Sequence, residues 1–101
     1  MSRTAPANGA RGEVCRELGG RQRRLCLTLG ALAEMEDAFE AQGAQALTAR
    51  LASPSASDLI LILAILLRGG GETVDEAQIA RFRASDAASA AIAAFEAAGA
   101  P

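Results

Sequence analysis

The most constraining feature of this sequence is a run of nine consecutive apolar residues at positions 59–67. Ser55 and Asp58 lie just before the run, and Arg68 and three glycines follow it. The run is too short to cross a bilayer as a helix, which needs roughly 20 apolar residues, and too apolar for a helix with one solvated face. It must therefore be covered on nearly every side, either in the centre of a small bundle or by a partner.

The composition argues against catalysis. The chain has 101 residues, which is one domain, and it contains no His, Trp or Tyr. Because His is the side chain most used in general acid–base catalysis, we predict a protein that is not an enzyme and has no catalytic or cofactor-binding residues. An acidic group on one predicted helix favours a solvated face over a metal site, since residues two apart on a helix do not face each other. Its members are Glu34, Glu36, Asp37 and Glu40.

The charge is distributed unevenly along the chain. Six arginines and two glutamates lie in residues 1–24, whereas the rest of the chain is acidic. A basic end is typical of proteins that bind nucleic acid, but no aromatic residue lies among these arginines to stack on a base. A DNA-binding regulator therefore remains the least favoured alternative, and it would use Arg16, Arg21, Arg23 and Arg24.

The N-terminal sequence has no apolar run of the length found in signal peptides, so we expect a cytoplasmic protein. Cys15 and Cys26 are then expected to be reduced thiols. Residues 1–11 contain Pro, Gly and small residues without periodicity, which predicts a disordered tail. Residues 12–101 are predicted to form a single small domain.

Residues 13–29 alternate apolar and polar side chains around a glycine pair, which predicts a β-hairpin. Two registers are open. A loop of Gly19 and Gly20 places Val14 opposite Leu25, whereas a loop shifted by one residue places Cys15 opposite Cys26. An isolated hairpin is marginally stable in water, so its apolar face must be covered by helices.

The rest of the chain is predicted to be helical. Periodicity and capping signals place helices at about residues 31–41, 44–52, 56–68, 74–83 and 87–98. The capping signals are a capping box of Ser55 and Asp58, a second box of Thr73 and Glu76, and Asp86 as a single cap. Leu32, Met35 and Phe39 recur along the apolar face of the first helix, and Ile92 and Phe95 are the large apolar residues of the alanine-rich last helix. The predicted fold is therefore α+β and mostly α, with an N-terminal two-stranded hairpin packed on four to five short helices.

The helix at 56–68 carries Asp58 and Arg68 at the two ends of one stripe, with Leu61 and Ile65 between them. If the charged ends mark the solvent side, Leu61 and Ile65 are exposed in the monomer, and such an apolar patch is typical of a contact site. The three glycines after Arg68 lack the Lys of a phosphate-binding loop, which favours a flexible hinge.

Several segments together resemble a known family. They are Gly12-Glu13-Val14, the stretch LTLGALAEMEDAF at residues 27–39, Ser57-Asp58-Leu59, and LRGGG at residues 67–71. Across residues 12–96 the chain resembles the small tail-assembly proteins of bacterial gene transfer agents and related prophages. Their genes lie between those of the major tail protein and the tape measure, and relatives are labelled tail assembly chaperone or tail tube protein.

The resemblance implies a chaperone that keeps the tape measure or the tail tube subunits soluble in the bacterial producer cell until the tail assembles. Partners would be the tape measure protein, the major tail protein or both, with no membrane and with homo-oligomerisation left open. The contacts would be apolar, with a partner helix held in a groove by Leu61, Ile65, Ile92 and Phe95. A structural component of the tail tube is the alternative.

Overall fold

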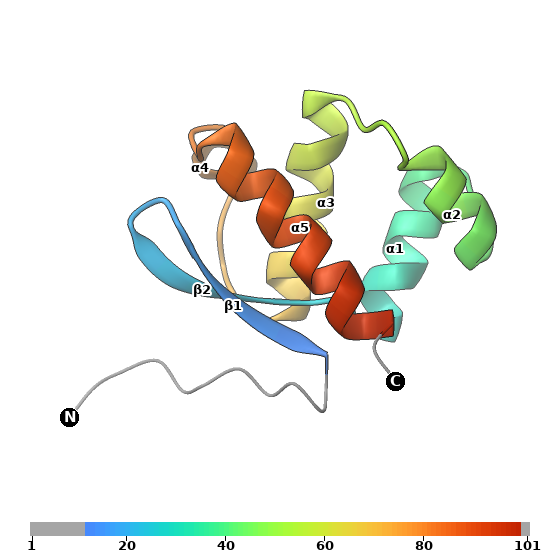
Figure 1. Ribbon diagram of the computed structural model, residues 1–101, viewed down its shortest axis with the longest axis horizontal. Helices are drawn as coiled ribbons and strands as arrows, with labels where there is room; N and C mark the ends of the chain where they lie inside the picture. Colours follow the sequence, from blue (N-terminus) through green and yellow to red (C-terminus); the bar gives the residue numbers. More distant parts are fainter. Residues whose placement is uncertain (1–11, 100–101) are drawn as a thin grey trace.

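The computed structural model describes residues 12–99 and confirms the predicted fold class. Within this range an antiparallel hairpin is followed by five helices. In chain order the elements are β1 (Glu13–Leu18), β2 (Arg21–Cys26), α1 (Leu29–Phe39), α2 (Ala44–Arg50), α3 (Ala56–Gly69), α4 (Glu76–Ile79) and α5 (Ala84–Gly99). Helix α3 lies in the middle, α5 crosses it, the hairpin lies on one side and α1 and α2 lie on the other (Figure 1). The predicted tail at 1–11 lies outside the described residues.

The hairpin turns at Gly19 and Gly20, whose φ angles are 65° and 87°. A two-residue type I′ turn needs positive φ at both central positions, which glycine adopts without steric cost. The turn places Val14 opposite Leu25. The first of the two predicted registers is therefore correct, and the register that would place Cys15 opposite Cys26 is not formed.

The second strand is shorter than predicted, because a helix cap interrupts it. Thr28 is the N-cap of α1, and its Oγ1 accepts a hydrogen bond from the backbone N–H of Ala31 at 3.0 Å. Capping of this kind satisfies a backbone donor that would otherwise lack a partner at the helix start. Strand β2 therefore ends at Cys26, and Leu29 is the first residue of α1. The predicted hairpin at 13–29 and the predicted helix start at 31 are corrected accordingly.

The apolar run forms the core of the molecule. Residues 62–67 of α3 are six consecutive buried positions, none more than 2% exposed. They are covered by α1, α4, α5 and β2, which pack around α3. At the start of the helix, Ser55 and Asp58 form the predicted capping box, with reciprocal hydrogen bonds of 3.0 Å. The position of the run in the centre of a small bundle is thus confirmed for the single chain.

The end of α3 is fixed by hydrogen bonds. Gly71 has a φ of 86°, its N–H donates to the carbonyl of Arg68 at 3.0 Å, and the N–H of Glu72 donates to the carbonyl of Leu67 at 2.8 Å. This pair of bonds is a Schellman motif, which commonly has glycine at the residue with positive φ. The glycine triplet is therefore a defined helix end, and the predicted flexible hinge is wrong.

The other two glycines allow α3 to touch the edge of the sheet. A Cβ atom added to Gly69 would overlap the carbonyl oxygen of Cys26, and one added to Gly70 would overlap that of Arg24. In this register the backbone groups of Arg24 and Cys26 point away from β1. The N–H of Arg24 donates to Glu72 Oε2 at 3.1 Å. The end of α3 thus covers the outer edge of β2, which limits pairing of that edge with another chain.

The fourth predicted helix is much shorter than 74–83. Asp75 is the N-cap of α4, and its Oδ1 accepts from the N–H of Gln78 at 2.8 Å, so the expected capping box at Thr73 is not the one used. Helix α4 is a single turn that ends at Ile79. Helix α5 then begins at Ala84, which places Asp86 in the first turn instead of at the predicted cap.

Candidate partner-binding groove

An apolar groove of about 890 Å³ lies between α1, α2, α5 and the N-terminal half of α3. Its only polar side chains are those of Thr28 and Thr48, and no charged residue of the described range 12–99 lines it. Pockets of this size are typical of binding sites. The largest side chains that line it and are not fully buried are Leu27, Leu29, Leu32, Leu51, Leu59, Ile92 and Phe95.

Two large aliphatic side chains of the groove face solvent. Leu29 is 84% exposed and Ile92 is 57% exposed. Leu29 is the first residue of α1, where a side chain points back past the helix start and away from the core. Ile92 lies on α5, whose buried positions are all alanines, namely Ala87, Ala90, Ala91 and Ala94. The apolar surface is therefore open to solvent at Leu29 and at Ile92.

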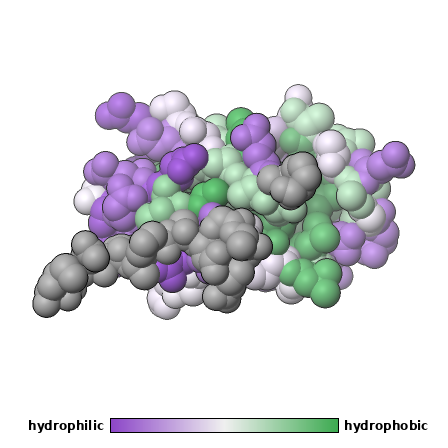
Figure 2. Space-filling view, turned by 60° about the horizontal axis from the view of Figure 1, so that its bottom comes forward, coloured by the Kyte–Doolittle hydropathy of each residue, from purple (hydrophilic) through white to green (hydrophobic). Residues whose placement is uncertain are grey.

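Figure 2 shows how this surface is distributed. Hydrophobic residues gather to the right of centre, on the side of the molecule that carries α1 and α2, and hydrophilic residues gather on the side of the hairpin. An apolar patch with a hydrophilic rim on a small protein marks a contact site. The groove is thus the strongest candidate site for binding a partner.

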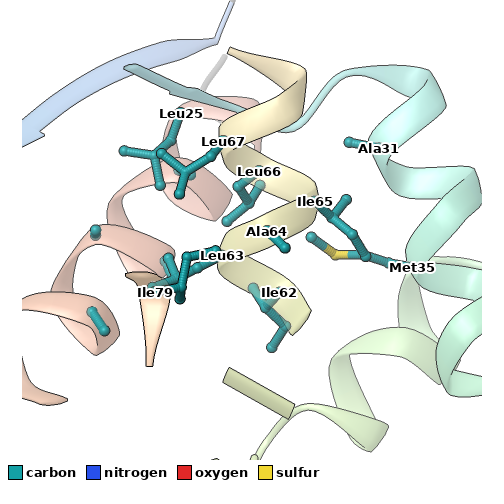
Figure 3. Packing of buried hydrophobic residues seen from close by; sticks show 14 of the residues in the cluster. Leu25, Ala31, Met35, Ile62, Leu63, Ala64, Ile65, Leu66, Leu67 and Ile79 are labelled. Carbon is teal, nitrogen blue, oxygen red and sulfur yellow. The ribbon is translucent and has the colours of Figure 1, made fainter. Parts of the chain in front are cut away.

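The structure brings together two of the four predicted contact residues. Ile92 and Phe95 line the groove from α5. Ile65 is only 1% exposed, and it points toward Met35 of α1 (Figure 3). Leu61 is half-buried and does not line the groove. The prediction that Leu61 and Ile65 are exposed together in the monomer is therefore wrong for Ile65. Of the four predicted contact residues, only Ile92 and Phe95 lie in the groove.

Ile65 is buried because the charged residues at the two ends of its helix stripe, Asp58 and Arg68, bind neighbouring helices. Asp58 pairs with Arg50 of α2 at 3.1 Å, and Arg68 pairs with Glu34 of α1. The stripe therefore faces the neighbouring helices and not the solvent. Charge at the end of a helix stripe indicates solvent only when no opposite charge is available nearby.

Five of the large, partly exposed groove residues were not predicted as contacts, namely Leu27, Leu29, Leu32, Leu51 and Leu59. Leu29 was assigned to the strand, and Leu32 was expected to face the core with Met35 and Phe39. The capping position of Thr28 was the signal that could have placed Leu29 at an exposed helix start.

Arg50 joins three helices beside the groove. Its Nη1 and Nη2 donate to the two carboxylate oxygens of Asp58 at 3.1 and 3.4 Å. Its guanidinium also lies 5.2 Å from the centre of the Phe39 ring. The hydrogen bond from Arg50, together with one from the N–H of Ser55, holds the pKa of Asp58 below its ordinary value.

This environment predicts an acid-sensitive link between α2 and α3. A carboxylate with a lowered pKa in the folded state contributes stability above its unfolded pKa, and this contribution is lost as the pH falls through the lower folded value. We expect the melting temperature of the wild type to fall more steeply than that of Asp58→Asn between about pH 5 and about pH 2. Circular dichroism melts of both proteins across this range test the prediction. Parallel curves would contradict it.

A comparison with protein families identifies the chain. The family model described as "Phage tail tube protein, GTA-gp10" matches residues 11–99. The chain belongs to this family. No curated protein and no solved structure matches it significantly.

Membership in the GTA-gp10 family gives the protein a role in the tails of phage-like particles. It confirms the resemblance to gene transfer agent tail proteins that the LTLGALAEMEDAF and LRGGG segments indicated. The function of the groove therefore has to be sought among the interactions of a tail protein. None of the helices between residues 12 and 99 is long and apolar enough to span a membrane.

Two carboxylates of the acidic cluster, Glu34 and Glu36, bind other parts of the protein. Glu34 pairs with Arg68, and Glu36 Oε2 accepts a hydrogen bond from the N–H of Gly43 at 2.8 Å. In the described part of the chain, no group of three or more His, Cys, Asp or Glu residues is arranged to hold a metal ion.

The arginines of the hairpin do not form one exposed basic surface. Arg23 is only 5% exposed, its Nε donates to the carbonyl of Leu18 at 2.8 Å, and its guanidinium lies 5.5 Å from the centre of the Phe82 ring. Arg23 therefore joins the hairpin to the segment before α5, and it is not available for contact with a nucleic acid phosphate.

Proposed function

We propose that this protein is a tail assembly chaperone of a gene transfer agent, and that its groove holds an apolar helical segment of the tape measure protein. It acts by binding alone, without catalysis, in the cytoplasm of the bacterial producer cell. The observation that carries the proposal is the groove itself, whose lining is uncharged and includes the exposed side chains of Leu29 and Ile92. Such a groove matches the mode of recognition in which the apolar face of an amphipathic helix binds between helices.

Co-expression tests this proposal. We expect the protein to co-purify with the tape measure protein of its own gene cluster and to increase the soluble fraction of that protein. The major tail protein, expressed separately with the chaperone, is the second candidate partner. Absence of a complex with both proteins would refute the proposal.

A structural component of the tail tube is the second candidate, and the family description favours it. A tube built by continuing a sheet from subunit to subunit needs open strand edges. Both strands here have six residues, and the outer edge of β2 is covered by residues 69–72. Quantitative mass spectrometry of purified particles distinguishes the two roles, because a tube subunit is present in many copies per particle and a chaperone is absent.

A further inference from the structure

The groove has one wall that is attached differently from the others. Helices α1, α3 and α5 contribute buried side chains along their lengths, whereas α2 has seven residues and buries only Leu47. Its main packing contact is with α1. Residues 44, 47, 48 and 51 of this segment nevertheless line the groove.

The two ends of α2 are held by polar contacts. At its start, Gly43 has a φ of 90° and no side-chain cap, and its N–H donates to Glu36. At its end, Arg50 holds Asp58 of α3 with both guanidinium nitrogens and lies over the Phe39 ring of α1. The connection to α3 that follows, residues 52–55, is exposed.

We propose that α2 is an adjustable wall of the groove and that Arg50 is the latch that holds it against α1 and α3. This inference rests on the proposed function of the groove, since it describes how the groove changes width to admit a helix. Breaking the contacts of Arg50 leaves α2 attached by Leu47, by the hydrogen bond between Gly43 and Glu36, and by its backbone connections. The C-terminal end of the wall is then free to move while the packing of α3 is retained. An element with few buried contacts is expected to open locally at a lower free energy than the core.

Hydrogen exchange on the free protein tests the latch. In Arg50→Gln we expect amides of residues 44–51 to exchange about three to thirty times faster than in the wild type, the range set by a lost surface ion pair and a lost cation–π contact. Amides of α3 should be unchanged. The fluorescence of 1-anilinonaphthalene-8-sulfonate should rise, because the opened groove exposes more apolar surface.

The matched control is Arg68→Gln, since Arg68 also links two helices through an exposed ion pair, here with Glu34. It lies outside the groove lining, so exchange in residues 44–51 should stay as in the wild type. Arg50→Lys keeps the charge but loses the two-nitrogen geometry, and it should give an intermediate exchange rate.

Equal exchange of residues 44–51 in the wild type and in Arg50→Gln would overturn the latch, as would an increase spread evenly over all helices. Because these measurements need no partner, they fail or succeed independently of the co-purification experiment. If Arg50→Gln shows the faster exchange but the wild type binds no tail protein, the proposed function is refuted and the latch is retained.

Discussion

Replacing either Gly69 or Gly70 by alanine is expected to lower the free energy of unfolding by about 3 kcal/mol, near the upper end of the usual range for overpacking. An added Cβ at either position overlaps a carbonyl oxygen of β2, at Cys26 and Arg24 respectively. Backbone atoms cannot rotate away as a side chain does, so α3 and β2 must separate. For a domain of this size the loss corresponds to roughly 15 °C in melting temperature.

The control for this prediction is Gly30→Ala. Gly30 also lies in a helix, but the nearest atom to its added Cβ is Thr28 Oγ1 at 3.9 Å. Alanine has a higher helix propensity than glycine, so this variant should be neutral or slightly more stable. If Gly69→Ala and Gly70→Ala melted at the same temperature as Gly30→Ala, the close approach of α3 to β2 would be disproved.

The second large effect concerns binding. The double variant Leu29→Glu/Ile92→Glu should fold like the wild type, because both side chains are mostly exposed, yet it should bind the tape measure protein about 100 times more weakly. Each buried aliphatic contact contributes about 1.5 kcal/mol at the lower end of the usual range, and about 1.4 kcal/mol is a factor of ten in affinity. A carboxylate placed in an apolar contact adds a desolvation cost.

Titration calorimetry with the purified tape measure protein, or quantitative co-purification if that protein is insoluble alone, measures the effect. Ala38→Glu is the control, because Ala38 is exposed on α1 but does not line the groove. It should bind like the wild type. Undiminished binding by the double variant would show that the groove is not the contact surface.

The existence of the helices, the cap of α3 and the hairpin turn followed from local sequence. The capping box of Ser55 and Asp58 and the glycine pair of the hairpin predicted α3 and the turn, because both depend on residues within one turn of chain. The prediction failed where one capping residue competed with another, as at α4. There Asp75 caps a single helical turn in place of the longer helix expected from Thr73.

The site was predicted only in part. Ile92 stood out because it is one of few large apolar residues in an alanine-rich helix. Leu29 did not, since a strand that continues to residue 29 and a helix that begins there have similar local patterns. The exposure of Leu61 and Ile65 was inferred from the charges at their stripe ends, and those charges proved to be paired with other helices.

The sequence by itself determined that residues 59–67 had to be enclosed, because nine apolar side chains in a row leave a helix no polar face. It also determined the elements that enclose them, through periodicity, caps and glycines. Only the tertiary structure decided which face of α3 meets α1, why Gly69 and Gly70 cannot carry side chains, and where apolar surface is left open. These properties depend on contacts between residues far apart in the chain, and such contacts leave no periodic pattern in the sequence.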